Sequence, residues 1–282
     1  MKRGIFGRPY VDLEPYVDLD ELAALDEEIC AGLCQVPIDY TGGSHKWMGI
    51  VPPSLAEGGE DGEDGEDGND SAYADYGEAI AAMTRDQFAR FVALSDTPDA
   101  FDLERRHDYE FGEEREWPLN RRQMRYLEYR YRVYFPWKVF YELMPNPRWE
   151  ERASAGSEGF TDEARRLFPH TVAFVERLPF AHVGRCNLLG LQSNDHGTVH
   201  RDAEDEPDVG HFITLCPRGD KRLFLWDERT GARTPIARRA YWFDDRNYHG
   251  VEAAPHFRYS IRVDGVFTPR FFERLRRDHG DA

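Results

Sequence analysis

The sequence predicts an α+β protein in which N-terminal helices cover a sandwich or barrel of short strands. Before residue 180, apolar residues recur at helical spacing in several segments. From about His182 onward, short apolar runs alternate with turn residues, and this pattern is typical of an all-β region. Helices first and strands later favour a fold in which the helices pack against the outside of the strand region.

The first predicted helix starts at Asp18 or Asp20 and continues to about Gln35. A second begins at Thr84, where Thr84 and Gln87 match a capping box ahead of an apolar face. The residues that we expect to be buried on these two helices are Leu22, Leu25, Ile29, Leu33, Phe88, Phe91 and Val92.

A longer helix is predicted from Asn120 towards Tyr134, and it mixes five arginines with four tyrosines. Such a mixture can track a single nucleic-acid strand. The simpler interpretation is that Tyr126, Tyr129 and Val133 pack on one side, while the arginines pair with the many acids of the chain. A further helical region, 161–178, has Thr161 as its cap and is divided at Pro169.

Six strands are predicted in the second half of the chain. They are 185–191, 198–202, 211–216, 222–226, 239–243 and 256–267. We divide the chain into a mostly helical region, 1–178, and a strand core, 179–282, which together form one integrated domain. Three Glu-Asp-Gly triplets near 56–70 lack the ligand order of a calcium loop, and we interpret them as a disordered acidic insertion.

Composition narrows the function classes. The net charge of −17 opposes nucleic acid or an anionic membrane as a general partner, and it is compatible with a small neutral or cationic substrate. No apolar run approaches the roughly 18 residues that span a bilayer, and no secretory signal is visible, so we expect a cytoplasmic protein. The four cysteines lack zinc-site spacing, and we interpret them as structural thiols. The sequence does not indicate an oligomeric state.

Three residues suggest a metal site. His200 and Asp202 are spaced i, i+2, which points both side chains to one side of an extended segment. His249 is the candidate for the third ligand. Two neutral imidazoles and one carboxylate occupy one face of an octahedral ferrous ion, so the opposite face stays open for a chelating cosubstrate and dioxygen. Taken singly, each residue has an ordinary explanation as a surface or loop side chain.

The strand after His249 suggests an anion clamp. Between residues 256 and 264 polar and apolar residues alternate, which places Arg258, Ser260 and Arg262 on one face. A guanidinium grips a carboxylate with two parallel hydrogen bonds, and a neighbouring hydroxyl adds a third. This is what the far carboxylate of 2-oxoglutarate requires.

The ordered set His-x-Asp, distal His and Arg-x-Ser resembles the Fe(II)/2-oxoglutarate-dependent oxygenase superfamily over roughly residues 180–268. The resemblance implies a jelly-roll (double-stranded β-helix) core, with Fe(II) bound by His200, Asp202 and His249. It also implies that Arg258 and Ser260 hold 2-oxoglutarate and that O2 is the oxidant. Because position 202 is Asp, and not the Gly or Ala of related halogenases, it implies hydroxylation or another oxidation of a C–H bond.

Further residues are assigned around this set. Asn187 lies on an alternating segment ahead of the His-x-Asp pair, where it either binds cosubstrate or is a buried, hydrogen-bonded amide. Arg262 is the rival of Arg258 for the cosubstrate carboxylate, and it could also hold substrate. Gln192, Asn194 and His196 are candidates for the pocket mouth. The acidic loop 203–208 could steer a cationic substrate, although a solvated loop explains it as well.

The sequence thus predicts a 2-oxoglutarate-dependent hydroxylase of a small biosynthetic substrate, such as an amino acid or peptide. Two alternatives stay open. One is a cupin-like protein that binds a metal or small molecule without turnover, and the other is an oxygenase directed to nucleic acid.

Overall fold

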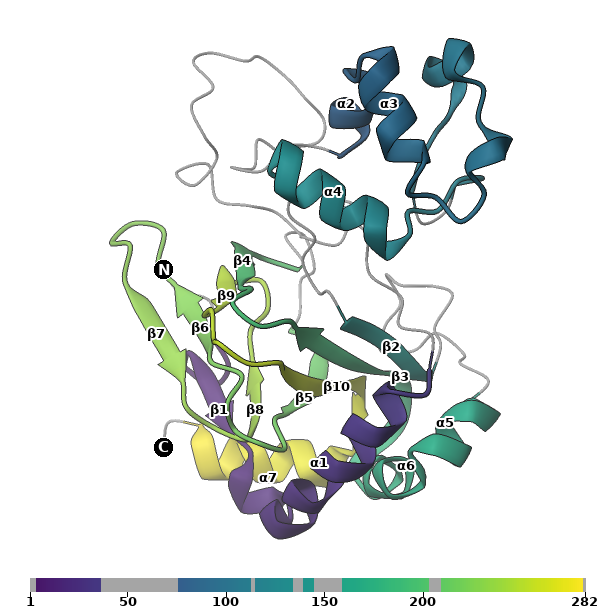
Figure 1. Cartoon of the computed structure of the whole chain (residues 1–282). Helices are drawn as coiled ribbons and strands as arrows, with labels where there is room; N and C mark the ends of the chain where they lie inside the picture. Colours follow the sequence, from purple (N-terminus) through teal and green to yellow (C-terminus); the bar gives the residue numbers. More distant parts are fainter. Residues whose placement is uncertain are drawn as a thin grey trace. The chain divides into compact units, whose positions relative to one another are not determined.

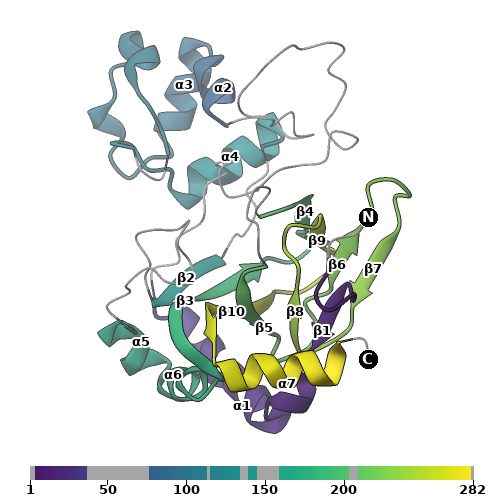
Figure 2. The same cartoon turned by 180° about the vertical axis from the view of Figure 1, so that it is seen from behind.

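The computed structural model describes residues 4–36, 76–112, 115–133, 139–144, 159–202 and 209–280 of the chain (Figures 1 and 2). The chain divides into two compact units. The first combines Met1–Asp39 with Val139–Ala282, and the second is Tyr40–Lys138. This division does not follow the predicted boundary at residue 178, because both ends of the N-terminal region belong with the strand core. The acidic insertion near 56–70 lies outside the described residues.

The described strands of the first unit form two antiparallel sheets. The larger sheet has the order β1 (Tyr10–Asp12), β8 (Ala240–Phe243), β5 (His211–Leu215), β10 (Arg258–Phe267), β3 (Phe180–Leu191) and β2 (Val139–Met144). The smaller sheet has the order β4 (Gly197–His200), β9 (His249–Val251), β6 (Leu223–Trp226) and β7 (Arg233–Ile236).

The chain crosses repeatedly between these sheets. Strands β3, β5, β8 and β10 lie in the larger sheet, whereas β4, β6, β7 and β9 lie in the smaller one. Eight strands that alternate in this way between two packed antiparallel sheets are a jelly roll. The predicted fold class, an α+β protein with a jelly-roll core, is therefore confirmed. Among the described residues, no helix has the length and hydrophobicity that crossing a bilayer requires.

Strand β10 separates a polar interior from an apolar exterior. Its odd residues face the helices, as the hydrogen bond from the Tyr259 hydroxyl to Asp26 of α1 (Leu19–Leu33) shows. Its even residues face the smaller sheet, because Arg262 contacts Asp202 just beyond β4. Register pairing extends the interior face to β3 and β5, where Asn187 and Thr214 lie opposite Arg262.

Among its described residues this unit has four α-helices, and Figure 1 shows α1, α6 and α7 on the side of the larger sheet away from the smaller one. They are α1, α5 (Asp162–Leu167), α6 (Pro169–Glu176) and α7 (Pro269–His279). The Asp18 carboxylate accepts hydrogen bonds from two backbone N–H groups of α1, and Thr161 caps α5 in the same manner. The predicted helix starts and the division at Pro169 are confirmed.

Glu28 of α1 holds the start of α6. Its carboxylate accepts hydrogen bonds from the N–H groups of His170 and Thr171 and from the Thr171 hydroxyl, at 2.7–2.9 Å. A negative charge at a helix N-terminus is stabilising. We expect Glu28→Gln to lower the free energy of unfolding by about 1–2 kcal/mol. Denaturant titration measures this loss, and Glu27→Gln, an exposed neighbour on the same helix, should change stability by less than about 0.5 kcal/mol.

The second unit contains α2 (Tyr76–Ala81), α3 (Arg85–Val92) and α4 (Arg121–Tyr131), together with the short 3-10 helices η4 (Pro98–Ala100) and η5 (Leu103–Asp108). The predicted capping box of Thr84 and Gln87 is present at the start of α3. Phe88, Phe91 and Val92 are buried, as predicted, in a separate apolar cluster of this unit.

The prediction for the packed side of α4 is confirmed in part. Val133 is buried in the apolar cluster and Tyr126 packs against it, together with Met124 and Leu127. Tyr129, also expected to pack, is 82% exposed, and its amphipathic side chain can keep a polar end in water. Arg122 pairs with Asp96, as expected for an arginine in this acid-rich chain.

Candidate metal centre

Strand pairing places His200 and His249 side by side. β4 and β9 are antiparallel neighbours, and His200 lies directly opposite His249 in their register. Cross-strand partners in a sheet have Cβ atoms roughly 5 Å apart. The two imidazole rings lie 4.6 Å apart between centroids, and both side chains are buried. Two imidazoles far apart in the sequence thereby lie side by side as candidate nitrogen ligands.

Gly250 allows β9 to fit between its neighbours. A Cβ atom at this position would lie 2.8 Å from the Phe224 ring of β6 and 3.0 Å from the Gly197 carbonyl oxygen of β4. The glycine after His249 therefore permits the close packing that brings His249 against His200.

Asp202 follows β4 and is fixed by a turn. Its backbone N–H donates to the Asp245 carbonyl oxygen at 3.0 Å. The turn itself is held by the buried Asp244, which accepts hydrogen bonds from the Arg246 guanidinium through both carboxylate oxygens. Asn247 donates its backbone N–H to the Asp244 carbonyl oxygen. This turn leads from β8 in one sheet to β9 in the other, so it positions Asp202 and His249 together.

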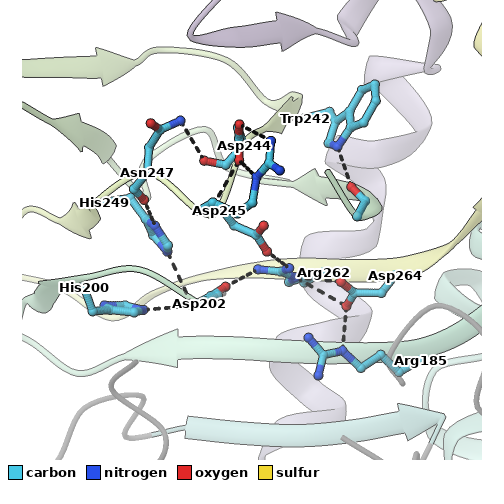
Figure 3. Close-up of polar contacts among 12 residues, drawn as sticks. Arg185, His200, Asp202, Trp242, Asp244, Asp245, Asn247, His249, Arg262 and Asp264 are labelled. Atoms are coloured by element: carbon cyan, nitrogen blue, oxygen red, sulfur yellow. Dashed lines mark hydrogen bonds and ion pairs between the residues drawn. The ribbon is translucent and has the colours of Figure 1, made fainter. Parts of the chain in front are cut away.

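The three predicted ligands meet, as Figure 3 shows. One potential ligand atom from each of His200, Asp202 and His249 lies within 4.8 Å of the others. Asp202 Oδ1 is 3.2 Å from His200 Nε2 and 3.7 Å from His249 Nε2. Its side chain is 23% exposed, so the cluster is accessible from one side.

The tautomers of both histidines favour a cation at this point. His200 Nδ1 lies 2.8 Å from the Thr198 carbonyl oxygen, and His249 Nδ1 lies 2.9 Å from that of Asn247. A carbonyl oxygen only accepts hydrogen bonds, so each neutral imidazole carries its proton on Nδ1 and its lone pair on Nε2. Both lone pairs then face a carboxylate oxygen, and a metal ion between them removes the repulsion.

The protonation states also suit a metal. Burial lowers the pKa of His249 to about 4, although the Asp202 charge opposes the shift. Burial alone would raise the pKa of Asp202, but His249, His200 and Arg262 hold it well below its usual range. A neutral imidazole and an ionised carboxylate are the forms that bind metals. The donor set of two nitrogens and one carboxylate therefore fits the ferrous ion that the family resemblance implies.

Arg262 is joined to this cluster. Its guanidinium donates to Asp202 at 2.9 Å, to Asp245 at 2.7 Å and to Asp264 at 3.1 Å (Figure 3). Burial would lower the pKa of Arg262, but the three carboxylates raise it, so the side chain stays cationic. The structure thus brings Arg262 next to a predicted metal ligand, with its hydrogen bonds directed at acids.

Arg258 is placed differently. The side chain is fully buried, and its terminal nitrogens donate to the backbone carbonyl oxygens of Gln192, Asp195 and Glu252. These contacts tie together the loop after β3 and the segment after β9. Arg258 therefore anchors loops, and its predicted role in holding the cosubstrate stays a prediction.

Sequence reasoning did not single out Lys221. Its Nζ donates to Ser260 Oγ at 2.8 Å and to the Leu189 carbonyl oxygen at 3.0 Å, and the residue is 5% exposed. Burial, together with the nearby Arg258 and Arg262, lowers the pKa of Lys221 to about 7. One signal was available, because Lys221 is the only lysine after residue 138 in a chain that otherwise uses arginine.

Asn187 also lies on the interior face. It is 1% exposed, it pairs in register with Arg262, and its Oδ1 has no hydrogen-bond partner among the described residues. Asn194, in the loop after β3, adopts a φ of 65° and donates its N–H to the Ala254 carbonyl oxygen. The predicted acidic loop 203–208 lies outside the described residues.

Neither a protein-family model nor a curated protein sequence matches this chain. Several solved structures do match this chain. A 2OG-Fe(II) oxygenase family oxidoreductase from Burkholderia pseudomallei is 13% identical, with 44% of this chain and 65% of that chain covered and a TM-score of 0.32. A prolyl hydroxylase from Trichoplax adhaerens, in complex with a hypoxia inducible factor peptide, is 12% identical, with coverages of 49% and 64% and a TM-score of 0.29.

A cupin 2 conserved barrel domain protein from Salinispora arenicola is 13% identical, with coverages of 50% and 84% and a TM-score of 0.24. The matches to the first two proteins span less than two thirds of their lengths. 2OG-Fe(II) oxygenases and prolyl hydroxylases are thus among the structural neighbours of this chain.

Proposed function

We propose that this protein is an Fe(II)/2-oxoglutarate-dependent oxygenase that oxidises a C–H bond of a small molecule. The observation that carries the proposal is the meeting of His200 and His249, on the paired strands β4 and β9, with Asp202 just after β4, with their potential ligand atoms within 4.8 Å. When bound there, iron supplies the oxygen chemistry that couples decarboxylation of 2-oxoglutarate to substrate oxidation.

Several buried polar side chains support a polar ligand between the sheets. Burying polar groups is costly, and departures from an apolar core concentrate at functional sites. The larger sheet, together with Lys221 two residues before β6, contributes the following polar side chains, each less than 9% exposed: Arg185, Asn187, Thr214, Lys221, Arg258, Ser260, Arg262 and Asp264. Such an interior suits a dianion better than an apolar ligand.

For the far carboxylate of 2-oxoglutarate we propose Lys221 and Ser260. The two are hydrogen-bonded, and Ser260 lies two residues before Arg262 on the interior face of β10. Arg262 contacts the candidate ligand Asp202. Two residues of a strand span about 7 Å, so Ser260 lies at a distance from the metal centre that is comparable to the length of the 2-oxoglutarate carbon chain. Lys221 supplies a cation and Ser260 a hydroxyl donor. Asn187 Oδ1 has no hydrogen-bond partner within the described part of the chain and faces the same interior, which supports a place for this residue in ligand binding.

For the substrate we propose a small biosynthetic molecule such as an amino acid or peptide. The net charge of −17 supports neutral and cationic molecules over polyanions, because the long-range field of the protein repels the latter. We further propose that the product is hydroxylated, since Asp202 completes the ligand set.

The test is succinate release from 2-oxoglutarate under Fe(II), ascorbate and air, screened over amino acids, peptides and small metabolites. We expect succinate to form only when oxygen is present and to rise with the right substrate. His200→Ala should reduce the rate to the level without enzyme. Succinate formation that is unchanged in this variant contradicts the proposal.

A further inference from the structure

We propose that Arg262 is the positioning residue of the metal centre. Its guanidinium holds Asp202 Oδ2, so that this carboxylate binds metal through Oδ1 alone. The inference rests on the proposed metal site, and it concerns no property of the cosubstrate. It also replaces the predicted role of Arg262 as a cosubstrate ligand.

The two oxygens of Asp202 have separate partners. Oδ1 faces the Nε2 atoms of His200 and His249 at 3.2 and 3.7 Å. Oδ2 accepts a hydrogen bond from Arg262 Nη1 at 2.9 Å. A charge-assisted hydrogen bond of this kind fixes the orientation of a carboxylate. One oxygen is therefore directed to the histidines and the other is held away from them.

Arg262 is itself fixed in one orientation. Nη2 donates to Asp245 Oδ2 at 2.7 Å, and Nε donates to both carboxylate oxygens of Asp264 at 3.1 and 3.3 Å. The guanidinium also lies over the Phe212 ring at 4.0 Å from its centroid. Because Nε, Nη1 and Nη2 are all engaged and the planar group is stacked, Arg262 cannot turn towards a bound diacid without losing these contacts.

A second layer supports these contacts, as Figure 3 shows. Arg185 Nε donates to Asp264 Oδ2 at 2.7 Å, and both side chains are at most 3% exposed. Asp245 is connected to Asp202 in two ways. Its carboxylate accepts a hydrogen bond from Arg262, and its carbonyl oxygen accepts one from the Asp202 N–H. These contacts join three carboxylates and two guanidiniums. Their net negative charge favours a cation at Asp202 Oδ1.

Coordination by a single oxygen matters for the chemistry. Two imidazoles and one carboxylate oxygen fill three of the six positions of an octahedral ion. The other three suffice for a chelating cosubstrate and dioxygen. If both oxygens of Asp202 bound the metal, one of these positions would be lost. Arg262 thus keeps the site open, and it does so without touching the metal, cosubstrate or substrate.

The test measures metal affinity in the full-length apoprotein without cosubstrate, by anaerobic competition between protein and a chelating dye for Fe(II) or Co(II). The variant is Arg262→Gln combined with Asp245→Asn. The second substitution is included because the buried Asp245 carboxylate would otherwise lose its cationic partner. Asp245→Asn alone is the matched background. We expect the double variant to bind metal about 10- to 100-fold more weakly than this background. The visible spectrum of the Co(II) form should change as well, because the second oxygen of Asp202 becomes available.

Arg262→Lys is the second variant, and it keeps the buried charge. Its ammonium can donate to Asp202 Oδ2 but cannot serve three carboxylates in one plane. We expect metal affinity between those of the wild type and the double variant. Unfolding of the metal-free variants is followed in parallel, because a purely structural role would lower thermal stability and leave the metal affinity of folded protein unchanged.

The proposal is overturned if Arg262→Lys and the double variant both bind metal within about threefold of their references. A failure of the proposed oxygenase function looks different. In that case the wild type binds metal but releases no succinate, and the effect of Arg262 on metal affinity is still measured.

Discussion

Replacing His249 with alanine should abolish both metal binding and succinate formation. His249 offers one of the three candidate ligand atoms and lies directly opposite His200 in the sheet. Loss of a group that only supports a metal ligand costs about 10- to 100-fold in affinity, so loss of the ligand itself should cost more than about 100-fold. Anaerobic dye competition measures the metal affinity, and succinate release measures the activity.

The control for this prediction is His182→Ala, which removes an exposed histidine of β3. We expect wild-type metal affinity and wild-type activity in this variant. If His249→Ala retains metal affinity within about threefold, the three-ligand site is wrong.

Lys221→Met should weaken the binding of 2-oxoglutarate by about 10- to 100-fold, the equivalent of losing a hydrogen bond to a charged group. Metal affinity should stay within about twofold, because Lys221 is hydrogen-bonded to Ser260 and the Leu189 carbonyl oxygen and is not one of the three candidate ligands. Isothermal titration of 2-oxoglutarate into the anaerobic Fe(II) protein separates the two effects. The neighbouring exposed cation provides the control, and Arg222→Met should bind cosubstrate normally.

The pH dependence of this binding has a definite sign. Burial, with Arg258 and Arg262 nearby, lowers the pKa of Lys221 to about 7. Below this pH the amine is a cation that attracts the carboxylate, and above it the free amine is neutral. The affinity for 2-oxoglutarate should therefore be constant below pH 7 and fall by up to about tenfold per pH unit above it. In Lys221→Met this fall should disappear, and a fall that persists contradicts the assignment.

Local patterns in the sequence predicted α1, α3, α4, α5 and α6, but not α2 or α7. The stripe Leu22, Leu25, Ile29 and Leu33 is buried on α1, and Thr84 caps α3 as its sequence indicates. These features depend on residues within a few positions of each other, so sequence alone defines them.

Four of the strands in the described residues were not predicted, and each omission has a physical reason. β1 and β9 have three residues, too few for a visible alternation. β2 has no clean alternation, and β7 contains Pro235, which an edge strand tolerates but which argues against a strand in sequence. Because β9 was not predicted, the sequence could not show that His249 lies opposite His200, which follows from the pairing of β9 with β4.

His200, Asp202 and His249 could be named as candidate ligands from the sequence because their residue types and order resemble a known family. The partners of the ligands were not. Arg258, Arg262 and Lys221 are all cations near the interior, and only the fold distinguishes the loop anchor, the carboxylate clamp and the partner of Ser260. Which buried cation meets which acid depends on register between strands distant in sequence.

The most direct test of the central claim is an anaerobic titration of the protein with Fe(II) followed by 2-oxoglutarate, monitored in the visible range. We predict a metal-to-ligand charge-transfer band that appears only when both are present, at one equivalent of each, and that is absent in His249→Ala. Tight Fe(II) binding with no band and no heat of 2-oxoglutarate binding would contradict the account and would identify a metal-binding protein without oxygenase chemistry.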